Sequence, residues 1–229
     1  MENQHILVSS ATDIDRATFF RKTYSHVAIA ILAFIVVETL LLKIVPTETI
    51  MFMLGGRFVW LFIIGLFWLG TTMSNKLAFH PSQNQQYLGL GLYVLLEAII
   101  FLPMIAIALS YAGSDMLVQA ATITLFMFSG LTAVVFLTKT DFSFLRTAII
   151  VGGFVALGAI VVGAIFGFNL GLWFSVGMVV LASASILYQT SQIKDQYNTD
   201  QYVGAALQLF ASIMLLFWYV LRILMSRRS

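Results

Sequence analysis

Long apolar stretches alternate with short polar gaps along the whole chain. A run of about 20 apolar residues is long enough to cross the hydrocarbon layer of a membrane as a helix. Lipid offers the backbone no hydrogen-bond partners, so each crossing stretch must be helical. Seven stretches meet this condition, at residues 24–45, 57–74, 87–110, 116–138, 144–166, 170–190 and 202–225. The pattern therefore predicts an all-α polytopic membrane protein with seven transmembrane helices.

The composition excludes several other classes of protein. Hydrophobic residues make up 60% of the 229-residue chain and charged residues only 10%, which is too much apolar surface for a soluble domain of this length to hide. There is no cysteine, which excludes disulfides and thiolate metal sites. Lysine and arginine are scattered rather than clustered, so we expect the lipid bilayer as a partner and no nucleic acid.

The predicted organisation is a single transmembrane domain. Residues 1–20 form a short polar N-terminus on the cytoplasmic side, residues 21–226 the seven-helix domain, and residues 227–229 a basic tail. The compact loops and the absence of a targeting extension favour a bacterial cytoplasmic membrane over an organelle.

Basic residues in the short loops predict the orientation, because such residues stay on the cytoplasmic side. The gaps on the N-terminal side carry Arg16, Arg21, Lys22, Lys76, Lys139, Arg146 and Lys194. The opposite loops carry only Lys43 and Arg57, so we expect a cytoplasmic N-terminus. With seven spans, Arg222, Arg227 and Arg228 would emerge on the outer side against this rule, unless one apolar stretch is re-entrant. We expect seven true spans.

Two glutamates interrupt the apolar stretches. Glu97 lies near the middle of the third span, where an ionisable group costs on the order of 2.5–3.5 kcal/mol on insertion scales, so it should face the interior of the bundle. Its carboxyl group either hydrogen-bonds a neighbouring helix or belongs to an ion or proton path. Glu38 lies nearer the outer boundary of the first span, where it is either a further residue of the ion path or polar core or, in the simpler interpretation, an interfacial acid that reaches toward water.

Polar residues recur at helical spacing in the last two spans. The stripe of the sixth span holds Ser185, Gln189 and Gln192, and that of the seventh holds Gln201, Gln208, Ser212 and Tyr219. Residues with these spacings share one face of a helix, and a polar face is unfavourable against lipid. The stripes should therefore meet each other or water. They serve either as hydrogen bonds between helices or as the wall of a narrow polar path.

Small residues mark the fifth span, where Gly163 and Gly167 form a GxxxG pair that predicts close packing between helix backbones.

The sequence lacks the common catalytic motifs. The sequence has no HExxH, GxSxG or GxxxxGK[ST] pattern, and its three histidines are far apart. We therefore expect no enzyme activity, no cofactor and no metal site.

Four segments, in order, resemble the transmembrane Bax inhibitor motif (Bax inhibitor-1-like) family, and the similarity extends from Arg21 to Arg222. They are residues 87–97 (YLGLGLYVLLE), 138–145 (TKTDFSFL), 186–190 (ILYQT) and 202–210 (YVGAALQLF). The second segment, a loop with Lys139 and Asp141, is the most specific. The resemblance implies seven helices with the last one central, and a calcium-leak activity that some members regulate by pH through two aspartates.

The two aspartate positions of the family are occupied differently in this chain. The matching residues are Gln189 and Ser212, so the chain is similar to an atypical member without the paired acids. Two nearby carboxyl groups can share a proton and respond to pH, whereas an amide and a hydroxyl cannot ionise in the physiological range. The resemblance therefore implies an ion or calcium leak whose pH gating is lost or altered.

Two hypotheses of function remain open. In the first, the protein is an ion leak with Glu97 as the intramembrane acid and Gln189, Gln208 and Ser212 as the polar lining, with calcium or another cation as cargo. In the second, it is a non-conducting membrane protein that modulates a quality-control protease complex or a stress response. Its polar N-terminus would then be the natural contact.

Overall fold

The computed structural model describes residues 6–138 and 140–227, excluding the side chains of residues 57 and 58. The helices in these ranges are α1 (Asp13–Ile44), α2 (Thr47–Leu54), α3 (Arg57–Ala78), α4 (Gln83–Ala112), α5 (Ser114–Leu137), α6 (Leu145–Phe166), α7 (Gly171–Asp195) and α8 (Tyr202–Ser226), preceded by a 3-10 turn, η1 (Val8–Ser10). Seven of these helices, all except α2, are long and apolar enough to cross a membrane. The predicted all-α polytopic class is confirmed.

The first helix begins earlier than the predicted span, at Asp13 rather than at residue 24. The Thr12 side chain accepts a hydrogen bond from the Asp15 backbone N–H at 3.2 Å, which caps the helix start. Asp13 and Asp15 lie in the first turn, where negative charge is favoured by the helix dipole. Polar residues predicted to precede the span are therefore the first turns of α1.

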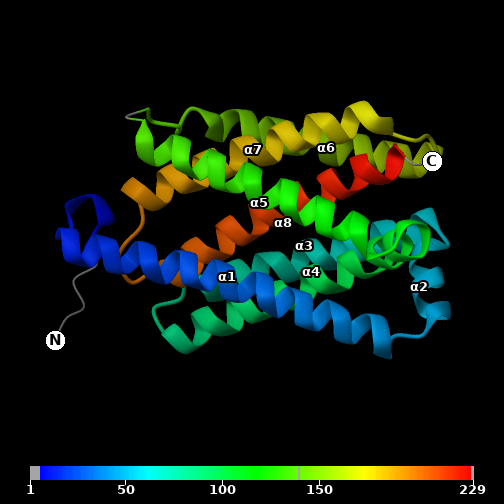
Figure 1. Cartoon of the computed structure of the whole chain (residues 1–229), viewed down its shortest axis with the longest axis horizontal. Helices are drawn as coiled ribbons and strands as arrows, with labels where there is room; N and C mark the ends of the chain where they lie inside the picture. The colour runs from blue at the N-terminus through cyan, green and yellow to red at the C-terminus, as the bar shows by residue number, and fades with distance from the viewer. Residues whose placement is uncertain (1–5, 139, 228–229) are drawn as a thin grey trace.

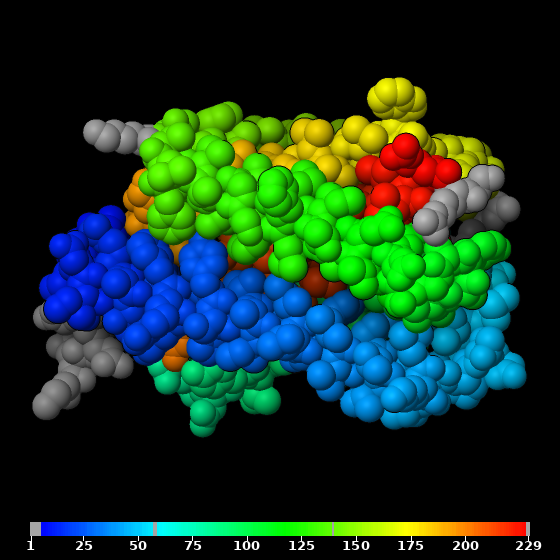
Figure 2. Space-filling view, in the orientation of Figure 1, coloured from blue at the N-terminus to red at the C-terminus, as the bar shows by residue number. Residues whose placement is uncertain are grey.

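The last helix is the centre of the bundle. Helix α8 packs against α1, α3, α4, α5 and α7, and a cluster of Ala156, Met178 and Tyr219 joins it to α6 and α7. Among its side chains, Leu207, Phe210 and Leu216 are fully buried. In the space-filling view the middle of α8 shows only between α1 and α5 (Figure 2). This arrangement confirms the prediction of a central last helix.

The long helices run along the length of the bundle, and the two chain ends lie at its opposite ends (Figure 1). We call these ends the N-terminal end and the C-terminal end. Seven long helices separate them, so Arg222 and Arg227 lie at the end opposite the N-terminus, and their conflict with the positive-inside rule remains. The N-terminal end remains our predicted cytoplasmic side, because the basic residues gather there.

Helices α3 and α4 approach each other closely at Gly89 of α4. A Cβ atom at this glycine would lie 2.6 Å from the backbone nitrogen of Ala78 and 2.7 Å from the carbonyl oxygen of Ser74. Real Cβ contacts are longer than this, so only glycine lets α3 and α4 pack at this distance.

The prediction of a close-packed GxxxG pair in α6 is wrong. Gly167 ends the helix with a φ of 76°, the left-handed conformation that glycine adopts at helix ends. A Cβ atom at Gly163 would have as its nearest neighbours the Phe168 carbonyl oxygen at 3.3 Å and the Leu170 side chain at 3.6 Å, both in the connection to α7. In this span Gly152 faces Leu181 of α7, whereas Gly158 has no atom within 4 Å.

Candidate functional site

A row of amide side chains crosses three helices inside the bundle. The Gln189 Nε2 group on α7 donates to Gln208 Oε1 on α8 at 3.4 Å. The Gln208 Nε2 group donates in turn to Asn75 Oδ1 on α3 at 2.7 Å, over 133 residues of sequence. The second of these bonds has the shorter donor–acceptor distance and links α3 to α8.

A second pair of polar groups lies one helical turn further toward the C-terminal end. The hydroxyl oxygens of Ser185 and Ser212 are 2.9 Å apart. Ser212 also donates to the Gln208 carbonyl oxygen at 3.0 Å, so Ser185 is the donor to Ser212. The stripes of α7 and α8 thus face each other, as their spacing predicts. We call Asn75, Ser185, Gln189, Gln208 and Ser212 the polar seam.

The sequence pattern missed Asn75, which it placed in a loop after the second span. Helix α3 continues to Ala78 and carries Asn75 inward against α8. The polar run from Thr71 to Asn75 suggested a span end, but the chain stops being helical only at Phe79. The later signal, Pro81 following the helix, marks this end more accurately.

Two aromatic rings cover the N-terminal end of the polar seam. Phe79 stacks on Tyr197 with ring centroids 5.9 Å apart and an angle of 16° between planes. Phe79 also packs on Gly204, where a Cβ atom would lie 2.5 Å from the ring. Phe79 is one turn from Asn75, and Gly204 is one turn from Gln208, so the rings lie directly beside the amide row. We call Phe79 and Tyr197 the aromatic lid.

The segment before α1 holds the aromatic lid in place. The Val8 side chain is fully buried, and its backbone N–H donates to the Tyr197 carbonyl oxygen at 2.9 Å. The Thr199 N–H donates to the Ile6 carbonyl oxygen at 3.0 Å, next to a β-bridge between Leu7 and Asn198. This part of the N-terminus is therefore docked on the α7–α8 loop.

The lid does not change charge at physiological pH. Burial, with a smaller contribution from neighbouring Tyr188, raises the pKa of the Tyr197 phenol above its usual value. A phenol is already neutral at pH 7, so this shift extends the neutral range of Tyr197 upward.

The two intramembrane glutamates lie outside the polar seam. Glu97 is buried on α4 and contacts the hydroxyl of Tyr93, one turn earlier on the same helix. Glu38 is 4% exposed, and neither of its carboxylate oxygens has a hydrogen-bond partner among the described residues. The interpretation of Glu38 as an interfacial acid reaching water is wrong, because its position on α1 faces the core.

In the loop of residues 138–145, Asp141 stabilises a turn. Asp141 Oδ1 accepts hydrogen bonds from the Ser143 backbone N–H at 2.9 Å and from its hydroxyl at 2.7 Å. These two bonds lower the pKa of the Asp141 carboxyl, which is fully exposed. The turn that they stabilise leads into α6. Lys139, the other residue predicted in this loop, lies outside the described residues.

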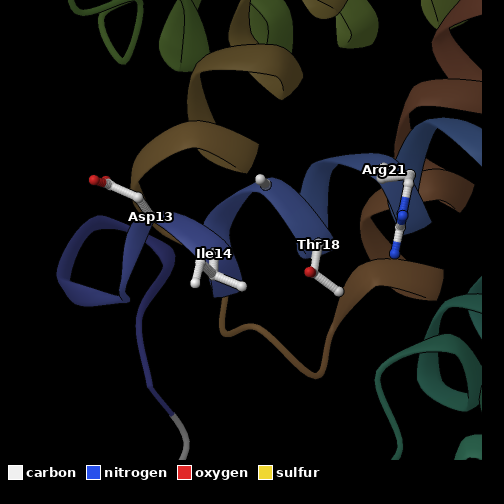
Figure 3. A pocket seen from close by; sticks show the side chains of 5 residues that line it. Asp13, Ile14, Thr18 and Arg21 are labelled. Atoms are coloured by element: carbon white, nitrogen blue, oxygen red, sulfur yellow. The ribbon is translucent and has the colours of Figure 1, made fainter.

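No metal centre or enclosed ligand pocket is visible in the described ranges. No three histidine, aspartate or glutamate side chains there are placed to hold one metal ion. A shallow hollow near the start of α1 is lined by Asp13, Ile14, Ala17, Thr18 and Arg21 (Figure 3). All five residues belong to one helix, so the hollow cannot surround a ligand.

Comparisons with known proteins agree with the fold and the motifs. The Pseudomonas aeruginosa protein PA2604, which is described as uncharacterized, is 40% identical over 112 residues, or 48% of this chain and 50% of that protein. The chain thus spans about half the length of the curated relative it matches. The sequence profile described as "Inhibitor of apoptosis-promoting Bax1" matches residues 16–229. The chain therefore belongs to the Bax inhibitor-1 family that its motifs resemble.

Proposed function

We propose that this protein is an ion leak of the bacterial cytoplasmic membrane, with calcium as its cargo and the polar seam as its path. The observation that carries the proposal is the part-buried hydrogen-bonded row from Asn75 through Gln208 to Gln189, which links three helices of the bundle. Amide carbonyl oxygens are among the ligands that calcium accepts. A row of amide oxygens along the central helix could bind a passing cation weakly, which an apolar core could not do.

The polar seam contains no group that could act as a pH sensor. The resemblance places paired aspartates at the positions of Gln189 and Ser212, which are 3.4 Å and 3.0 Å from their own partner atoms on Gln208. An amide and a hydroxyl keep the same charge from pH 5 to pH 8. The leak should therefore vary little with pH.

Calcium flux into proteoliposomes tests this proposal directly. Across pH 5 to 8 we expect a flux that changes less than about twofold, since none of the seam residues titrates there. The double substitution Gln189→Asp with Ser212→Asp should introduce a strong acid dependence, because carboxyl groups on the facing stripes of α7 and α8, each next to Gln208, become coupled. Gln201→Asp, which adds one acid in the α7–α8 loop, is the control. A steep response of the unmodified protein that Gln189→Ala removes would refute the proposal.

The aromatic lid gives a second test of the same path. Phe79→Ala removes the ring that lies between the amide row and the N-terminal end, so we expect calcium flux to rise several-fold. Phe144→Ala, at an exposed ring before α6, serves as the matched control and should leave the flux unchanged. An unchanged flux in Phe79→Ala would show that the ions do not pass beside Gly204.

The closed lid and the missing acids also favour a second candidate, a non-conducting protein that modulates a quality-control protease complex. Without carboxylates the polar seam attracts divalent cations less strongly. This candidate predicts no calcium flux in either the unmodified protein or Glu97→Gln, together with a membrane protease that co-purifies in stable amounts. Calcium flux in the unmodified protein would favour the ion leak, and an equal flux in Glu97→Gln would agree with a path through the polar seam, which does not contain Glu97.

A further inference from the structure

Three ring side chains from three helices form a cluster near the N-terminal end of the bundle. The His26 ring of α1 stacks on Tyr87 of α4, with centroids 5.6 Å apart and planes at 18°. The hydroxyl oxygens of Tyr87 and Tyr202 are 3.1 Å apart, which joins α4 to the start of α8. Lys22 places its Nζ atom 4.8 Å from the centroid of the Tyr202 ring. A cation thus lies beside an aromatic cluster.

An apolar groove begins at the same cluster and follows α4. Like the hollow on α1, it is open and lies on a single helix, so it could only support a chain lying along the surface; its residues are Asn84, Tyr87, Leu88, Gly91, Leu92 and Leu95. Gly91 forms its floor, because a Cβ atom there would have no neighbour within 4 Å. Seven residues separate Leu88 from Leu95, so the apolar part is about 10 Å long. Figure 2 shows the first turns of α4 at the surface beside α1.

One basic side chain, Lys22, lies beside this cluster, and one acid, Asp200, lies two residues before Tyr202. Lys22 and Arg21 are exposed on α1, whereas the first turns of α4 and α8 contain no acidic residue. The His26 Nδ1 atom lies 2.7 Å from the Lys22 carbonyl oxygen, which can only accept. Nδ1 is therefore the donor, and Nε2 remains available as an acceptor for an external hydroxyl.

We propose that this face is a binding site for one phospholipid with an anionic headgroup. Lys22 attracts the phosphate, Nε2 of His26 and the Tyr87 hydroxyl hydrogen-bond the headgroup, and one acyl chain lies in the groove over Gly91. Tyrosine and lysine side chains are suited to the boundary between headgroups and hydrocarbon, and the leucine groove to the hydrocarbon beneath it. The headgroup would thus contact basic and polar side chains, and the acyl chain would contact apolar side chains.

Native mass spectrometry of the purified protein with phosphatidylglycerol or phosphatidylcholine tests the proposal. We expect one phosphatidylglycerol to be bound more tightly than phosphatidylcholine. Lys22→Gln should weaken phosphatidylglycerol binding about fivefold, the factor that corresponds to one surface lysine near anionic lipid. Gly91→Leu should weaken both lipids, because it fills the groove without altering charge.

Two matched controls separate this site from general contact with lipid. Lys43→Gln removes a lysine from the opposite end of α1, and Gly130→Leu adds a side chain at a glycine of α5 that also has no atom within 4 Å. Equal losses in Lys22→Gln and Lys43→Gln, or in Gly91→Leu and Gly130→Leu, would overturn the proposal. So would a dimer that Gly91→Leu dissociates, since this face would then bind a second copy. Circular dichroism confirms that each variant is helical.

Discussion

Gly89→Ala is expected to lower the stability of the bundle by about 1–3 kcal/mol, the usual cost of overpacking a filled interior. The added Cβ atom would lie 2.6 Å from the nitrogen of Ala78 and 2.7 Å from the carbonyl oxygen of Ser74. Both are backbone atoms, so no side-chain rotation relieves the contact and the two helices must separate. Reversible unfolding of the protein in mixed detergent micelles measures the loss.

Gly91→Ala is the matched control, two residues along the same helix. A Cβ atom at Gly91 has no neighbour within 4 Å, and alanine favours a helix over glycine by about 1 kcal/mol. This variant should therefore be as stable as the unmodified protein or slightly more stable. Equal destabilisation of the two variants would show that helix propensity, rather than the contact between α3 and α4, decides the result.

Separating α3 from α4 would also disturb the polar seam. Ser74, whose carbonyl oxygen faces Gly89, directly precedes Asn75 in α3. A shift of α3 away from α4 moves Asn75 relative to Gln208 and lengthens their 2.7 Å hydrogen bond. The packing of one glycine thus helps to set the geometry of the proposed ion path.

Glu38→Leu is expected to raise the stability of the protein by about 1–3 kcal/mol, the desolvation penalty of a buried polar group that lacks a partner. Glu38 is 4% exposed, and both of its carboxylate oxygens lack hydrogen-bond partners among the described residues. Leucine fills a similar volume without a polar group. The same detergent unfolding measurement gives the change.

The control for this prediction is Glu48→Leu at the exposed start of α2, where the change should stay within about 0.5 kcal/mol. A loss of stability in Glu38→Leu would mean that the carboxyl group is stabilised by something other than the described side chains, such as a bound cation. A gain in stability together with a loss of flux would show that the acid is kept for function at the expense of stability.

The sequence predicted the features that the membrane itself imposes. Apolar length predicted the seven long helices, and polar spacing predicted that Gln189 on α7 and Gln208 on α8 face each other, because lipid tolerates neither an irregular backbone nor a polar face. Glu97 is buried, as its central position predicts. The surrounding lipid imposes these requirements on every span alike, so they can be predicted from the sequence of each span alone.

Other features depend on pairs of segments that are distant in sequence. Asn75 is a seam residue only because α3 extends past the expected span and lies against α8. Gly89 is closely packed because Ser74 and Ala78 of α3 lie against it, whereas the nearest neighbours of Gly163 in α6 belong to the connection that follows its own helix. Spacing within one helix shows which residues share a face, but not which neighbour that face meets.

The docking of residues 6–8 on the α7–α8 loop connects the start of the chain to the interior of the bundle. The Ile6 carbonyl oxygen and the Val8 N–H are bonded to Thr199 and Tyr197, and the Tyr197 ring covers the polar seam. Tension applied to the polypeptide upstream of Ile6 would therefore pass through two backbone hydrogen bonds to that ring. In the second proposed function, a protease that pulled on this end would apply force to the backbone at Tyr197 and Thr199.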